Sequence, residues 1–121
     1  MARRPAAGVT LVARPTQRVL LMRRSPFVYR PGLWSVPAGR IEPNEHPLDS
    51  AMRELNEETG FRGQVEVLGQ IEQPRFTNYI CVVPDEFKPR LNWENDMAGW
   101  FAKGYHPQPL HPGMERVLAT L

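Results

Sequence analysis

Three glutamates lie close together in residues 53–60, which read RELNEETG. Glu54, Glu57 and Glu58 have the i, i+3, i+4 spacing that places side chains on one face of a helix. Such a face is either a solvated acidic surface or a cation site, because like charges at this spacing repel. An oxygen-rich cluster suits Mg²⁺, with Mn²⁺ as a substitute, whereas zinc favours histidine and cysteine. The spacing therefore predicts a magnesium site if the acidic face does not simply point to solvent.

A magnesium site of this kind can polarise phosphorus and lower the pKa of a bound water molecule. Mg²⁺ binds a few carboxylates and completes its shell with water and substrate phosphate oxygens, so it can orient an in-line displacement. Arg53 stands four residues before Glu57, within reach of an ion pair that would fix the direction of that carboxylate. The sequence shows no Ser–His or Cys–His pairing that would indicate a covalent intermediate.

A helix over residues 47–59 is predicted to carry the three glutamates. Pro47 suits the first helical position, Asp49 suits the positive end of the helix dipole, and Gly60 is a typical C-terminal stop. The glutamates lie on the flank of the apolar stripe, so we expect them at the edge of a groove. The stripe that would pack on a sheet comprises Leu48, Ala51, Met52 and Leu55.

The remaining chain alternates short apolar runs with proline- and glycine-containing loops. Strands are predicted over 8–14 and 18–24, as a hairpin or meander, and then over 64–73, 75–83 and 98–102, with a terminal helix over 112–121. A short extended segment precedes the acidic helix and is broken at Pro37 and Gly39. This order predicts an α/β layered fold with a mixed sheet, and a single domain over residues 1–121.

Composition is that of an ordinary soluble domain, with 41% hydrophobic and 23% charged residues. The net charge of +2 lies partly in Arg3 and Arg4, which we interpret as a solvated tail, and it is too small to predict nucleic-acid binding. Cys81 is the only cysteine and is predicted to be buried and inert. Nothing in the sequence resembles a signal peptide or membrane span, so a cytoplasmic location is expected.

Residues 39–61, GRIEPNEHPLDSAMRELNEETGF, resemble the box of the Nudix hydrolase family (MutT-like), G-x5-E-x7-R-E-U-x-E-E-x-G-U, where U is bulky and aliphatic. Leu55 fills the first U and Phe61 fills the second with an aromatic ring. Ala38 stands where the family more often has the first glycine of a Pro-Gly-Gly lead-in. The fixed positions that match are Gly39, Glu45, Arg53, Glu54, Glu57, Glu58 and Gly60.

The resemblance implies a Nudix fold, in which a mixed β-sheet is sandwiched between helices (α/β/α), and a role for each box residue. Glu54, Glu57 and Glu58 would hold the divalent cations with the Ala38 carbonyl, and Glu57 or Glu54 would act as the base. Arg53 would orient Glu57. The supporting positions are Glu45, with a structural role, and Gly39 and Gly60, which permit tight turns.

Residues outside the box extend this hypothesis. Similar enzymes often hold a phosphate with an arginine near Arg23 and Arg24, of which we favour Arg24. They often add an acidic ligand from a later loop, where Glu94 is favoured and Asp96 is the alternative. Aromatic residues of this kind usually pack in the core, and the candidates for nucleobase contact are Tyr79, Trp34 and Phe76.

The predicted function is Mg²⁺-dependent hydrolysis of a nucleoside diphosphate linked to another moiety, with nucleoside triphosphates favoured. ADP-ribose, nucleotide sugars and dinucleoside polyphosphates remain as alternative substrates, and RNA 5′ ends would require further basic groove residues. A non-catalytic nucleotide-binding module is the competing class, although such modules usually lose box glutamates. The expected partners are the nucleotide and a second copy of the chain in a homodimer, without a stable nucleic-acid partner.

Overall fold

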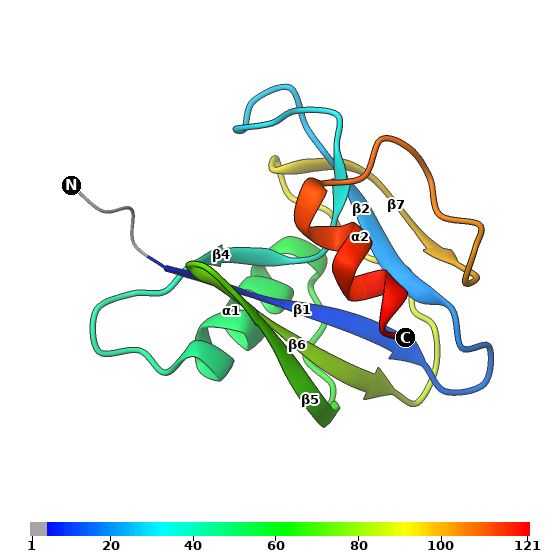
Figure 1. Ribbon diagram of the computed structural model, residues 1–121, viewed down its shortest axis with the longest axis horizontal. Coiled ribbons are helices and arrows are strands. Elements are labelled where there is room, and N and C mark those ends of the chain that lie inside the picture. The colour runs from blue at the N-terminus through cyan, green and yellow to red at the C-terminus, as the bar shows by residue number, and fades with distance from the viewer. Residues whose placement is uncertain (1–4) are drawn as a thin grey trace.

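The computed structural model describes residues 5–121, so Arg3 and Arg4 lie outside the described residues. Within these residues, the chain forms one mixed sheet and two helices (Figure 1). The strands are β1 (Ala6–Ala13), β2 (Val19–Arg24), β3 (Trp34–Ser35), β4 (Ala38–Arg40), β5 (Glu66–Gln73), β6 (Phe76–Val83) and β7 (Asn95–Phe101). The helices are α1 (Pro47–Thr59) and α2 (Pro112–Ala119).

Strand β1 is the centre of the sheet, as its run of buried residues predicts. It pairs in parallel with β6, from Ala6↔Phe76 to Ala13↔Val83, and antiparallel with β4. It meets β2 antiparallel only at Val12↔Val19, after which β2 pairs with β3 and β7. The order β3-β2-β1-β6-β5, with β4 beside β1 and β7 beside β2, makes the sheet mixed, as predicted.

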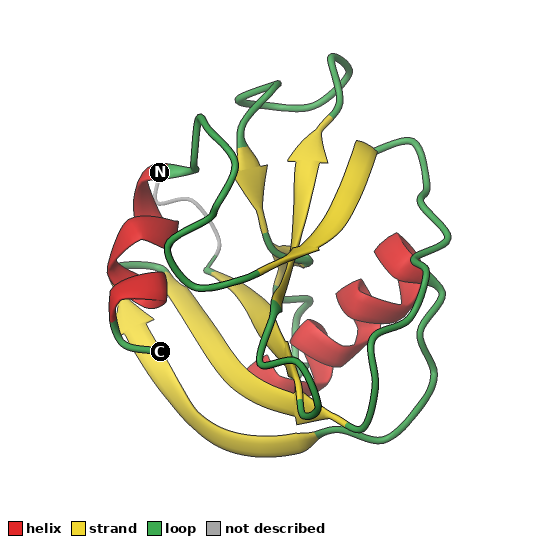
Figure 2. Cartoon of the chain, turned by 90° about the vertical axis from the view of Figure 1, so that its right-hand side faces the viewer, coloured by secondary structure: helices red, strands yellow, loops and turns green. Residues whose placement is uncertain are grey.

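The two helices cover opposite faces of the sheet (Figure 2). Alternate residues of β1 divide between the faces, since successive strand side chains point to opposite sides. Val9 and Leu11 pack with Ala51 and Leu55 of α1, whereas Val12 belongs to the cluster built on α2. This arrangement confirms the predicted α/β/α layering.

Helix α1 has the predicted bounds, Pro47–Thr59. The Nδ1 atom of His46 caps its start by accepting from the Leu48 N–H at 3.1 Å. Gly60 ends the helix in the left-handed region, with φ of 77°, and its N–H donates to the Asn56 carbonyl. The glutamates of α1 are therefore held on a helix that is fixed at both ends.

Several other predicted boundaries differ from the structure. The segment before α1 is broken at Pro37, as predicted, with β3 and β4 on either side of the break, but Gly39 lies within β4 and does not interrupt it. Strand β7 begins at Asn95 instead of residue 98, because Asn95 is buried and its backbone pairs with Arg24. Glu94 is therefore placed at the start of a strand and not within a long loop.

Residues 5–121 contain no helix with the length and apolar character needed to cross a bilayer.

Cys81 lies on β6 in the core beside α1 and is completely buried. Burial raises the pKa of its thiol to about 11. Because the thiolate is the reactive form, we expect DTNB to label the native protein more than about 100-fold more slowly than the protein unfolded in guanidinium. Stoichiometric labelling of the native chain at the unfolded rate would contradict this placement of β6.

Candidate functional site

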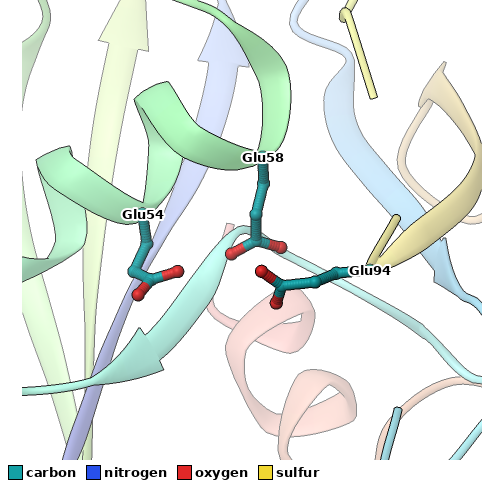
Figure 3. Close-up of side chains that lie close together, drawn as sticks. All are labelled: Glu54, Glu58 and Glu94. Carbon is teal, nitrogen blue, oxygen red and sulfur yellow. The ribbon is translucent and has the colours of Figure 1, made fainter. Parts of the chain in front are cut away.

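Three carboxylates converge where α1 meets the start of β7. Glu54 and Glu58 project from α1, and Glu94 lies directly before β7 (Figure 3). One oxygen from each of the three lies within 4.8 Å of the others. Glu54 and Glu94, 40 positions apart in sequence, are thereby brought close together. The sequence predicted Glu54 and Glu58 as members of this site and favoured Glu94 over Asp96 as the additional ligand.

The Glu58 carboxylate is almost completely buried. Its Oε2 accepts from the backbone N–H of Ala38 at 3.0 Å, and its Oε1 accepts from Nδ2 of Asn95 at 2.9 Å. Burial raises the pKa of Glu58 well above its usual value, the negative charges of Glu94 and Glu54 raise it further, and the hydrogen bond from Asn95 opposes the rise. The site therefore places negative charge where water cannot stabilise it.

Glu54 has a similar environment. Burial raises its pKa, and Glu57 and Glu94 add to the rise against the opposing charge of Arg53. A Cβ atom added at Gly39 would overlap the Glu54 carboxylate, so the glycine leaves the space that this side chain fills. Clustered carboxylates with raised pKa values fit a divalent cation, because a cation favours their ionised forms. The oxygen-only donor set suits Mg²⁺ or Mn²⁺.

Arg53 connects the carboxylates of the box. Its Nε and Nη2 donate to the two oxygens of Glu45 at 2.9 and 3.1 Å, and this bidentate pairing lowers the pKa of Glu45 to about 2. Its Nη1 donates to Glu54 at 3.0 Å and to Glu57 at 3.3 and 3.4 Å. Arg53 thus contacts Glu57, as expected, but its shorter bonds are to Glu45 and Glu54.

Glu57 is not part of the cluster of three carboxylates. Its side chain is 47% exposed and is held beside the cluster by Arg53. Its roles as a metal ligand and as a base therefore stay predictions.

Two asparagines that sequence reasoning missed position the acidic side chains. Asn95 donates to Glu58, as described above. Asn92 Nδ2 donates to the Glu57 carbonyl at 3.1 Å and to Glu94 Oε1 at 3.4 Å, and its Oδ1 accepts from the Glu94 N–H at 3.0 Å. The local sequence NWEN, with an amide on each side of a candidate ligand, was the available signal.

A cleft of about 630 Å³ adjoins the carboxylates and includes Ala38, Gly39, Glu54 and Glu94 in its lining. Four arginines from different elements line the same cleft. They are Arg24, Arg30, Arg40 and Arg75. A cleft lined by both guanidinium groups and carboxylates is suited to a phosphate chain, because guanidinium groups bind phosphate oxygens directly and carboxylates bind them through a cation.

Arg24 and Arg23 diverge, because neighbouring strand residues point to opposite faces. Arg24 lines the cleft, where its Nε donates to the Tyr29 carbonyl at 2.6 Å. Burial lowers the pKa of Arg24, and the nearby Glu58 and Glu94 oppose this. Arg23 instead pairs with Asp96 at 2.8 Å and does not line the cleft, so the structure brings neither Arg23 nor Asp96 to the carboxylates.

The structure places Trp34 and Tyr79 in the core and not in the cleft lining. Trp34 is 7% exposed and packs edge-on against Phe101, and Tyr79 is 5% exposed in the cluster beneath α1. Their predicted contact with a nucleobase is not supported, because each ring is covered by its neighbours. Phe76 is the candidate aromatic that lines the cleft.

Comparison with known families identifies the chain at the level of class. The family model described as the NUDIX domain matches residues 2–121, so the chain belongs to the Nudix family, as the box predicted. An RNA pyrophosphohydrolase from Mesorhizobium japonicum is 40% identical over 68% of this chain and 46% of its own length. An octanoyltransferase from Myxococcus xanthus is 37% identical over 71% of this chain and 27% of its own length. The chain thus spans about a quarter to a half of these relatives.

Solved structures share the fold over nearly the whole chain. A Nudix hydrolase from M. smegmatis is 26% identical, with a TM-score of 0.81 and coverage of 98% of this chain and 88% of its own. The MutT NUDIX hydrolase from Burkholderia pseudomallei is 22% identical, with a TM-score of 0.76 and 99% of each chain covered. The predicted Nudix fold is confirmed.

The space left by Gly39 provides a test of the carboxylate geometry. Gly39→Ala should displace the Glu54 carboxylate and weaken Mg²⁺ binding by about tenfold or more, because one oxygen ligand is misplaced. Binding can be read from the rise in melting temperature on adding Mg²⁺, which depends on the ratio of metal concentration to Kd. The control is Gly69→Ala on β5, where an added Cβ meets no atom within 4 Å. Equal Mg²⁺ responses in the two variants would refute the packing of Gly39 against Glu54.

Proposed function

We propose that this chain is a divalent-metal-dependent hydrolase that cleaves the pyrophosphate of a nucleoside diphosphate linked to another moiety, with nucleoside triphosphates as the favoured substrates. The observation that carries the proposal is the convergence of Glu54, Glu58 and Glu94 at a cleft lined by four arginines. Membership of the Nudix family supports it.

In this proposal Glu54, Glu58 and Glu94 hold Mg²⁺ or Mn²⁺, with Glu57 and the Ala38 carbonyl as further ligands. When bound, the cation supplies Lewis-acid stabilisation of the charge that develops on the phosphate oxygens. Asn92 and Asn95 keep Glu94 and Glu58 in place through the hydrogen bonds described above.

The remaining groups of the site have distinct roles in the proposal. Glu57 accepts the proton of the attacking water, since it is the exposed glutamate beside the cluster, and Glu54 is the alternative base. Arg53 is itself held in place by Glu45, and from there it positions both Glu54 and Glu57. Arg24 binds a phosphate through its Nη atoms, which have no hydrogen-bond partner in residues 5–121.

A second candidate substrate is the 5′ pyrophosphate of RNA. This function requires basic cleft residues beyond Arg24, and Arg30, Arg40 and Arg75 meet that requirement. The relative from M. japonicum is named as an RNA pyrophosphohydrolase, which favours testing it. Competition between 5′-triphosphorylated RNA and free nucleoside triphosphates would separate the two substrates by their kcat/KM values.

A panel of Mg²⁺-dependent assays tests the reaction class itself. Nucleoside triphosphates, ADP-ribose, nucleotide sugars and dinucleoside polyphosphates should be compared, with products resolved by chromatography. A nucleoside monophosphate and a phosphorylated remainder are the expected products. Nucleotide binding without any product in the presence of Mg²⁺ would instead indicate a non-catalytic binding module.

Replacing single carboxylates tests their roles in turnover. We expect Glu54→Gln, Glu57→Gln and Glu58→Gln each to lower kcat by about 100-fold or more while circular dichroism shows a retained fold, because each change removes charge from the metal site. The matched control is Glu115→Gln on the exposed face of α2, which should keep wild-type turnover. Wild-type rates in all three glutamate variants would reject the assigned site.

A further inference from the structure

The cleft continues beyond the carboxylates to a region formed by β6 and the start of α2. Phe76 and Asn78 of β6 line this region with His111 and Met114. In the sheet, Gly8 of β1 pairs with Ala38 on one side and Asn78 on the other. Two strand spacings therefore separate Ala38 from Asn78, a distance of about 10 Å. The region is thus adjacent to the metal site but distinct from it.

Asn78 is a fully buried amide with an incompletely satisfied donor. Its Oδ1 accepts from the Thr10 hydroxyl at 2.8 Å, which fixes the orientation of the amide. Its Nδ2 has one protein partner in residues 5–121, the Met114 sulfur at 3.9 Å, and a thioether is a weak acceptor. Buried amide donors ordinarily have a strong acceptor, so this N–H group is suited to a ligand atom that displaces the Met114 thioether at the wall of the cleft.

His111 supplies a second donor to the same region. Its Nδ1 caps α2 by accepting from the Gly113 N–H at 3.2 Å. Burial lowers the pKa of His111, and the charges of Arg30 and Arg24 lower it further, which favours the neutral ring. The single ring proton then resides on Nε2, because Nδ1 acts as an acceptor. No residue in the described range 5–121 accepts from this Nε2.

We propose that Asn78 and His111 form a nucleobase subsite that selects bases with a keto oxygen (guanine, uracil and thymine) over bases with an exocyclic amine at that position (adenine and cytosine). The proposal rests on the proposed nucleotide function and deepens it. Two N–H donors match a keto oxygen, which is an acceptor. An exocyclic amine is itself a donor, so it would leave both N–H groups without a hydrogen-bond partner. Phe76 and Met114 supply aromatic and apolar surface for the ring.

The first test compares kcat/KM for GTP with ATP and for UTP with CTP. Both pairs differ at the keto or amino position, and GTP also has a 2-amino group, so the pyrimidine pair is the more specific comparison. The wild type should favour the keto member of each pair by about 10- to 100-fold. His111→Ser should bring both ratios close to one, because serine keeps an oxygen that can cap α2 but lacks the ring donor. Ratios near one in the wild type, or unchanged ratios in His111→Ser, would overturn the subsite.

A matched control exists in the other helix. His46 caps α1 through its Nδ1, as His111 caps α2, but it does not line the cleft. His46→Ser should therefore preserve both substrate ratios. If both kcat/KM ratios fell close to one in His46→Ser, helix capping rather than contact with the base would control selectivity, and this would count against the proposal.

A second variant and a binding assay separate this proposal from the proposed function. Thr10→Val/Asn78→Leu replaces both partners of the buried hydrogen bond, which limits the loss of stability, and should abolish the keto preference. Calorimetry with GMP and AMP, without metal, should show tighter binding of GMP to the wild type and no preference in this variant. Equal binding of GMP and AMP by the wild type would refute the subsite even if triphosphates are hydrolysed. Failure to hydrolyse any nucleotide would refute the proposed function, and this binding assay alone would then decide the subsite.

Discussion

The burial of the Glu58 and Glu54 carboxylates between α1 and β4 is the constraint on which the rest of the site depends. Glu58 is held by the Ala38 backbone and by Asn95, so its carboxylate joins α1 to the preceding strand β4 and to the distant strand β7. This arrangement is electrostatically unfavourable without a cation, because burial and like charge both raise the pKa values of these groups. The fold therefore maintains buried carboxylates whose negative charge a divalent cation would neutralise, and the apolar packing of α1 must supply the stability that the carboxylates remove.

Glycines and one arginine make this burial geometrically feasible. Gly39 leaves room for the Glu54 carboxylate, and Gly8 faces Ala38 and Phe76, where a Cβ would lie 2.8 Å from the Ala38 Cβ and 2.9 Å from the ring. Arg53 keeps the acidic groups from separating, because one guanidinium reaches Glu45, Glu54 and Glu57 at once. The residues of the box therefore serve two purposes: some permit the close approach of α1 and the sheet, and others are candidate metal ligands.

Local signals predicted α1 and two members of the cluster, since a helix start, a helix stop and the i, i+4 spacing all lie within a few residues of one another. Interactions between distant segments decided the rest. Glu94 and Asp96 could not be distinguished until the start of β7 was known, and Arg23 and Arg24 differ only through strand alternation. Trp34 and Tyr79 had suitable chemistry, but their burial depends on Phe101 and on α1. The sequence did not predict Asn78 and His111 as site residues, because whether an N–H donor lacks a strong acceptor depends on which residues surround it in the fold.

The sheet register also bears on how the two proposed parts of the cleft would cooperate. Ala38, Gly8 and Asn78 lie side by side in three paired strands, so the distance between the metal site and the base region is set by backbone hydrogen bonds and not by flexible loops. Contacts with a base remote from the reacting phosphate accelerate a reaction when they hold that phosphate in the reactive geometry. A rigid spacing of this kind would express base selectivity in kcat as well as in KM, because a base that does not fit would shift the phosphates relative to Glu54 and Glu58.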